Sequence, residues 1–100
     1  MATLSVYISG AMTGLPECNY PAFHAKATEL RAKGYDVRNP AENFDGDTSL
    51  PRWMYLKEDI KNLLNSDRIV FLPGFEKSAG ALLEALVARE CNILTLGEHE

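Results

Sequence analysis

The chain has 100 residues, which is enough for one small domain with a single modest core. Hydrophobic residues make up 46% of it and charged residues 24%, as is typical of a globular domain. The 10 basic and 14 acidic residues give a net charge of -4, which argues against a protein that binds nucleic acid. The apolar runs are short and no basic segment precedes one at the start, so we expect neither a secretion signal nor a membrane span.

Four strands are predicted to alternate with three helices. Short apolar runs that end at glycine or proline, as buried strands do, predict strands over residues 4–9, 35–40, 68–73 and 92–97. Start and stop signals around periodic apolar residues predict helices over residues 19–34, 52–66 and 78–90. Residues 41–51 are rich in Asn, Asp, Gly, Ser and Pro, and are therefore expected to form a loop.

This alternation implies right-handed crossovers and a parallel sheet with helices on both faces. We expect a single α/β domain over residues 1–100, a flavodoxin-like or Rossmann-like three-layer sandwich with strand order 2-1-3-4. In that order the crossovers leave the neighbouring first and third strands in opposite directions, and such sheets bind ligands there, beyond the carboxyl ends of the strands. The glycine-rich segments 9–16 and 73–80 follow those two strands.

The second of these segments could bind an anion. Ser78 is expected to cap the third helix, so that the backbone N–H groups behind it, including those of Ala79 and Gly80, form an anion site. Gly80 would also let a ligand approach the backbone closely. The alternative interpretation is that Ser78 only caps the helix and that Gly80 only packs against the sheet.

The first segment, "SGAMTG", could wrap around a phosphate or a sugar, and we assign Ser9, Gly10 and Met12 to substrate binding. It is neither a GxGxxG dinucleotide motif nor a Walker loop, so we expect no bound cofactor. Cys18 and Cys91 fit no metal or redox spacing, and the two histidines are isolated. The simplest interpretation is a reduced, cytoplasmic protein without a metal site.

Two acidic residues are unusual because no cation lies three or four positions away to pair with them along the helix. Glu84 lies among small apolar residues in the third helix, and Asp59 lies on the flank of the second. Each could instead be a solvated surface acid, and Tyr7 taken alone could be a core residue. Two carboxyl groups beside a sugar-sized crevice suggest glycosidic chemistry, in which one attacks the anomeric carbon or stabilises an oxocarbenium ion and the other handles protons.

The segments "VYISGAMTG", "LKEDIKNLLNSDRIVFLPG" and "SAGALLEALVA" together resemble the nucleoside 2-deoxyribosyltransferase superfamily. The match is closest to small phage-type members and to the related 2′-deoxynucleoside 5′-phosphate N-hydrolases. The resemblance implies that Glu84 is the nucleophile, that Asp59 contacts the sugar and assists protonation of the base, and that Tyr7 orients the glutamate. It also implies that Ser78 holds a 5′-phosphate.

From this resemblance we expect an N-glycosidase, or an N-deoxyribosyltransferase, that acts on the base–sugar bond of a deoxynucleoside 5′-monophosphate. A nucleophilic Glu84 should face the crevice near Tyr7 and lie within about 5–6 Å of Asp59, as in retaining glycosidases. The alternative is a non-catalytic nucleotide-binding or regulatory module on the same fold. The expected partner in both cases is a small nucleotide or nucleoside.

The helices also bear on assembly. Four apolar side chains of the second helix are predicted to lie on one core-facing stripe: Leu56, Ile60, Leu63 and Leu64. The third helix is apolar almost all the way round, with Leu82 and Leu86 among the residues that point in different directions. One sheet covers only one side of such a helix, so we expect a homodimer or a larger homo-oligomer.

Overall fold

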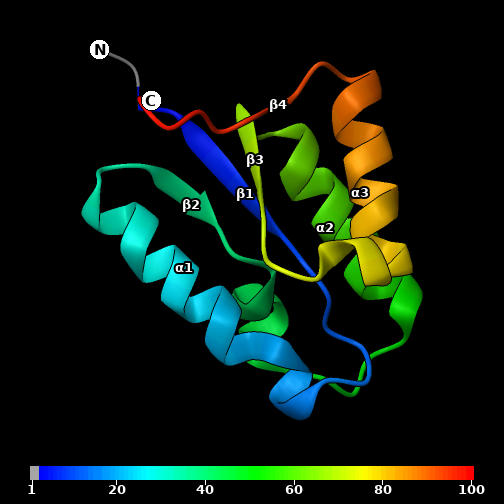
Figure 1. The fold of residues 1–100 in the computed structure, drawn as a ribbon. Helices are drawn as coiled ribbons and strands as arrows, with labels where there is room; N and C mark the ends of the chain where they lie inside the picture. The colour runs from blue at the N-terminus through cyan, green and yellow to red at the C-terminus, as the bar shows by residue number, and fades with distance from the viewer. Residues whose placement is uncertain (1–2) are drawn as a thin grey trace.

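The fold is a four-stranded parallel sheet covered by helices on both faces (Figure 1), in a computed structural model that describes residues 3–100. The strands are β1 (Ser5–Ser9), β2 (Asp36–Arg38), β3 (Arg68–Phe71) and β4 (Leu94–Thr95). Their order is β2-β1-β3-β4, and every neighbouring pair is parallel. The predicted fold class and strand order are therefore confirmed.

The three predicted helices are present with slightly shorter bounds. They are α1 (Tyr20–Ala32), α2 (Arg52–Leu64) and α3 (Ala79–Glu90). Asn19 precedes α1 in a left-handed conformation and does not cap it, because its side-chain amide donates instead to the backbone oxygen of Ala11. None of the helices within residues 3–100 is long and apolar enough to cross a membrane.

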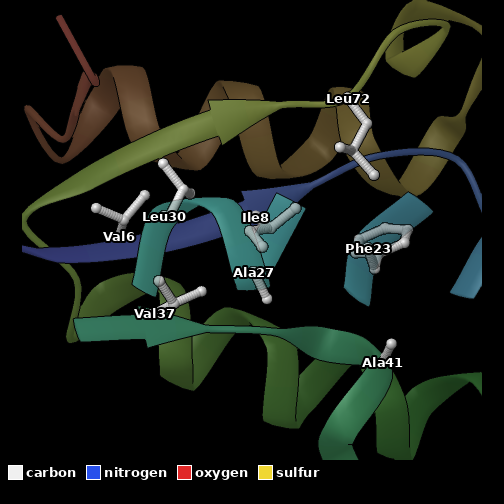
Figure 2. Packing of buried hydrophobic residues seen from close by; sticks show 8 residues of the cluster. All are labelled: Val6, Ile8, Phe23, Ala27, Leu30, Val37, Ala41 and Leu72. Carbon is white, nitrogen blue, oxygen red and sulfur yellow. The ribbon is translucent and has the colours of Figure 1, made fainter. Parts of the chain in front are cut away.

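The face of the sheet under α1 holds the larger apolar cluster. Phe23, Ala27 and Leu30 recur at helical spacing along one side of α1 and pack against Val6 and Ile8 of β1 (Figure 2). The cluster is completed by Val37, Ala41 and Leu72. The eight buried side chains of this cluster carry no ionisable group, so their main contribution is to stability.

The opposite face, under α2 and α3, is different in kind. Successive side chains of a strand point to opposite faces of the sheet, so Tyr7 points away from Val6 and Ile8 and toward α2 and α3. It packs there with Leu63, Ile69 and other buried apolar residues. A buried phenol therefore lies at the centre of this second layer.

The outer surfaces of α2 and α3 carry exposed apolar side chains. Leu64 is 52% exposed, so its predicted place on the core-facing stripe of α2 is wrong; it lies at the last position of that helix. On α3, Leu82 and Leu86 are exposed one turn apart, while Val87 packs against the second apolar cluster. The homo-oligomer expected from this pattern stays a prediction.

The connection between β2 and α2 is more ordered than the predicted loop. A 3-10 segment, η2 (Pro40–Gly46), occupies most of residues 41–51. Its first turn is fixed by the buried side chain of Asn39, which accepts a hydrogen bond from the backbone N–H of Ala41 at 3.0 Å. Further along, Phe44 and Asp45 adopt left-handed backbone conformations that residues other than glycine rarely take.

Candidate functional site

A cavity of about 400 Å³ opens where the connections after β1 and β3 meet the η2 segment and the start of α2. Its volume falls within the range of roughly 300–1,000 Å³ that is usual for small-molecule sites. Its lining mixes aromatic and apolar side chains with a few polar groups and two carboxyl groups, those of Asp59 and Glu84. This is the place in the fold at which parallel α/β sheets generally bind ligands.

Glu84 is the central polar group of the cavity wall. It lies in the second turn of α3 and is only 6% exposed. The hydroxyl of Tyr7 donates to its Oε2 at 2.6 Å, and the hydroxyl of Ser9 donates to its Oε1 at 2.6 Å. Both donors come from β1, two residues apart on one face of the strand. Glu84 is therefore held by two buried hydroxyls, and it is not a solvated surface acid.

Burial and these hydrogen bonds act on Glu84 in opposite directions. Removal from water raises the pKa of its carboxyl, while the hydrogen bonds from Ser9 and Tyr7 lower it. The pKa of Tyr7 lies well above its ordinary value, first because of burial and then because of the negative charge on Glu84. Tyr7 thus remains a neutral donor at any physiological pH, and it favours the ionised form of Glu84.

Asp59 is the second carboxyl group of the cavity. Burial, followed by the nearby charge of Glu84, raises the pKa of Asp59 from 3.8 to about 7. The side-chain amide of Asn43 donates to Asp59 Oδ1 at 2.7 Å and acts in the opposite direction. Near neutral pH Asp59 can therefore still bind a proton, while the two hydroxyls beside Glu84 favour the ionised form of that carboxyl.

Ser78 and Gly80 lie at the cavity at the start of α3. The hydroxyl oxygen of Ser78 accepts a hydrogen bond from the backbone N–H of Ala81 at 3.2 Å, so the predicted N-cap is present. A Cβ atom added to Gly80 would meet only this hydroxyl, at 3.8 Å, which is an ordinary contact. Packing within the chain thus does not require glycine here, contrary to the alternative interpretation that Gly80 serves only to pack against the sheet.

Gly10 is different, although it also lines the cavity. A Cβ atom on Gly10 would lie 2.9 Å from the Cβ atom of Leu72, closer than two carbon atoms can approach without displacement. Leu72 is buried in the apolar cluster under α1. Glycine at position 10 is therefore required by the packing of the connection that follows β1.

The structure brings the predicted site residues together. Seven of them line the cavity: Tyr7, Gly10, Met12, Asp59, Ser78, Gly80 and Glu84. Ser9 is fully buried and reaches the site through its hydrogen bond to Glu84. Ala79 is exposed at the first position of α3 and is not part of the cavity wall.

Sequence reasoning missed residues of η2, of the start of α2 and of the start of α1 that contact Asp59 or line the cavity. Asn43 contacts Asp59, and Arg52, Tyr20 and Tyr55 line the cavity. None of them stands in a recognisable spacing. For Ser9 a usable signal did exist, because a serine two residues after Tyr7 on a strand must point to the same face.

Cation binding finds no support in the arrangement of side chains. Within residues 3–100, no group of three or more His, Cys, Asp and Glu side chains is placed to hold a metal ion. Among the described residues, the polar groups at the cavity are two carboxyl groups, hydroxyl groups, the guanidinium of Arg52 and the N-terminus of α3.

Comparison with known proteins places the chain in a family. The crystal structure of a conserved protein from Enterococcus faecalis V583 is similar, with a TM-score of 0.65 and 26% sequence identity. The match covers 93% of this chain but only 62% of that one. A comparison with curated proteins found no match. Residues 4–96 match the family described as "Domain of unknown function (DUF4406)", and the chain therefore belongs to that family.

Proposed function

We propose that this protein is an N-glycosidase, or an N-deoxyribosyltransferase, that acts on the base–sugar bond of a deoxynucleoside 5′-monophosphate. The observation that carries the proposal is the Glu84 carboxylate, which is buried in a cavity wall between the hydroxyls of Tyr7 and Ser9. Burial of a carboxylate with no cation beside it lowers the stability of the fold. Buried acids with a perturbed pKa are concentrated at functional sites, which gives a reason for keeping one here.

The two carboxyl groups suit the two roles of a retaining mechanism. Ionised Glu84 attacks C1′ of the deoxyribose as the C1′–N bond breaks, and the bonding electron pair leaves with the base, which takes a proton from Asp59. Water then attacks C1′ and transfers a proton to Asp59, and the bond between C1′ and Glu84 breaks. A second base in place of water would complete a transfer.

The start of α3 supports the choice of a phosphorylated substrate. Ser78 and Gly80 line the same cavity as Glu84, and a helix N-terminus presents backbone N–H groups and a partial positive charge that favour anions. Arg52 lines the cavity as well and adds a full positive charge. A phosphate bound near Ser78 would place the sugar between it and Glu84.

The resemblance to the nucleoside 2-deoxyribosyltransferase superfamily supports the same proposal, because its expected nucleophile and orienting tyrosine fall on Glu84 and Tyr7, which are hydrogen-bonded here. We further propose that the chain acts as one domain and as a homodimer or larger assembly through the exposed apolar side chains of α3. Fold alone does not determine activity, so the proposal depends on the site.

The test is to incubate the protein with a panel of deoxynucleoside 5′-monophosphates and free deoxynucleosides and to measure the released free base by chromatography. Replacement of Glu84 by Gln keeps the shape of the side chain but abolishes the covalent step, so base release should fall by roughly 10³-fold or more while nucleotide binding is retained. The matched control is Glu90→Gln, which changes an exposed acid at the end of the same helix.

The outcomes separate the two functions considered. Base release by the wild type that Glu84→Gln abolishes and Glu90→Gln preserves would support the N-glycosidase. Binding of nucleotides without release of any base would favour the non-catalytic nucleotide-binding module. Release that continues in Glu84→Gln at the wild-type rate would contradict the assignment of the nucleophile.

A further inference from the structure

Asn43 is the one residue of η2 whose side chain reaches a carboxyl group of the cavity in the described structure. Its Nδ2 atom lies 2.7 Å from Asp59 Oδ1. The helical path of η2 breaks at Asn43, where ψ is 142°, and the next two residues, Phe44 and Asp45, are left-handed. Strained backbone of this kind persists where the surrounding structure holds it and is common at functional sites.

The direction of the Asn43 amide is fixed by a second amide. Asn62 lies three residues after Asp59, so both side chains lie on the same face of α2. Its Nδ2 atom points to Asn43 Oδ1 at 3.5 Å, a long contact that nevertheless sets an order of donation from Asn62 to Asn43 to Asp59. A reversed Asn43 amide would place its oxygen against Asp59 Oδ1 and its NH₂ group against that of Asn62.

We propose that Asn43 is a positioning residue that directs the proton of Asp59 to Oδ2, the carboxyl oxygen that Asn43 does not contact. An N–H group already occupies a lone pair of Oδ1, and this hydrogen bond makes Oδ1 the less basic of the two carboxyl oxygens. A proton bound by Asp59 is therefore favoured on Oδ2, and Asp59 lines the cavity, where this proton can meet a ligand. The use of this proton on a leaving base rests on the proposed function, whereas its location does not.

Several other groups act on the charge of Asp59 and must be kept constant in a test. Glu84 on α3 and Glu58 on α2 both disfavour its ionised form. Tyr7 on β1 and Tyr20 on α1 respond to its charge, since Asp59 raises the pKa of each phenol. Arg52 is a cation of the same cavity. None of these groups is altered by a substitution at position 43.

The experiment is an NMR titration of the Asp59 side-chain carboxyl carbon between about pH 4 and pH 9, with the signal assigned by its loss in Asp59→Asn. The test variant is Asn43→Leu, which has nearly the same shape without a donor, and Asn43→Ala is the second variant. The control is Asn65→Ala, which removes an exposed amide that binds only the backbone oxygen of Lys61. Loss of the Asn43 donor should raise the pKa of Asp59 by roughly one pH unit, because a hydrogen bond to the ionised form favours that form.

The same variants are assayed for base release as a function of pH. If Asp59 supplies the proton, the alkaline limb of the pH–rate profile should move to higher pH together with the measured pKa of Asp59. The value of kcat should also fall by roughly tenfold, because the carboxyl loses its fixed orientation. An unchanged pKa of Asp59 in both folded variants would overturn the inference. A shifted pKa in a protein that releases no base would support the donation from Asn43 to Asp59 Oδ1, on which the placement of the proton depends, and would contradict only the proposed function.

Discussion

The two walls of the cavity are built in different ways. One wall comes from β1 and the start of α3, where Tyr7 and Ser9 are fixed by the main-chain pairing of β1 with β2 and β3. The other comes from the connection between β2 and α2, where position depends on individual side-chain hydrogen bonds. In that wall the Tyr55 hydroxyl donates to the backbone oxygen of Asp47 and accepts from the N–H of Leu50.

This difference determines what each wall can do. The strand wall belongs to the most buried part of the molecule, so it can open only if the sheet itself unfolds. The connection that forms the other wall contains exposed residues such as Phe44 and Asp47 next to the cavity lining, and a few side-chain contacts hold it, so it can open locally at lower cost. The nucleophile candidate thus lies in the rigid wall, whereas Asn43, the proposed positioning residue for Asp59, lies in the adjustable connection.

The difference between the two walls should have its largest effect on the free energy of unfolding of two glycine variants, Gly10→Ala in the rigid wall and Gly46→Ala in the adjustable connection. A Cβ atom at position 10 would collide with the Cβ atom of Leu72, an atom that cannot move without the backbone, so the free energy of unfolding should fall by about 2–3 kcal/mol. Gly46 has a positive φ but only a distant contact with Ala41, so its substitution should cost about 1 kcal/mol in backbone strain. Urea denaturation of both variants measures this.

Equal losses in the two variants would contradict the contrast between a rigid and an adjustable wall. A Gly10→Ala loss smaller than that of Gly46→Ala would show that the connection after β1 can shift away from Leu72. Retention of the urea m-value in both variants is the control that the unfolding transition exposes the same surface.

The strand wall could be predicted from the sequence and the connection wall could not, for the same physical reason. Strand and helix periods follow from the backbone, so the apolar pattern placed Tyr7 on β1 and Glu84 on α3, and the crossover rule brought them to one crevice. The path of η2 depends on local contacts such as the Asn39 cap and the left-handed Phe44. No period encodes these, so Asn43 and its contact with Asp59 were invisible in the sequence.

The pH dependence of stability should be set by Asp59, where the two walls meet. Its folded pKa, about 7, lies above the ordinary 3.8, so the folded state binds the proton more tightly than the unfolded state. Its contribution is therefore fully present below about pH 4 and is lost as the pH rises through about 7, which should lower the free energy of unfolding by on the order of 3 kcal/mol across that interval. The raised pKa of Glu84 acts in the same direction.

Chemical denaturation of the wild type and Asp59→Asn between pH 5 and pH 8 measures this effect. The variant carries no titratable group at position 59, so its stability should vary less with pH and should exceed that of the wild type at pH 8. Asp67→Asn is the matched control: hydrogen bonds from Ser5 lower the pKa of Asp67, so its titration lies below this range and its removal should leave the pH dependence unchanged. A wild type whose stability is flat or rises across this range would contradict the raised pKa of Asp59.

The smallest effect on stability, and the sharpest test of the rigid wall as a binding surface, is expected from Gly80→Ala. Alanine is the better helix former, and its Cβ atom would meet only the Ser78 hydroxyl at 3.8 Å, so the free energy of unfolding should rise by a few tenths to about 1 kcal/mol.

Because Gly80 lines the cavity, the same methyl group would occupy the place of an anion at the start of α3. Calorimetry should therefore show roughly tenfold weaker binding of a deoxynucleoside 5′-monophosphate. Binding of the matched free deoxynucleoside, which lacks the phosphate, should change little. Equal weakening of both ligands would place the methyl group against the sugar or base instead, and unchanged binding of both would remove α3 from the phosphate site.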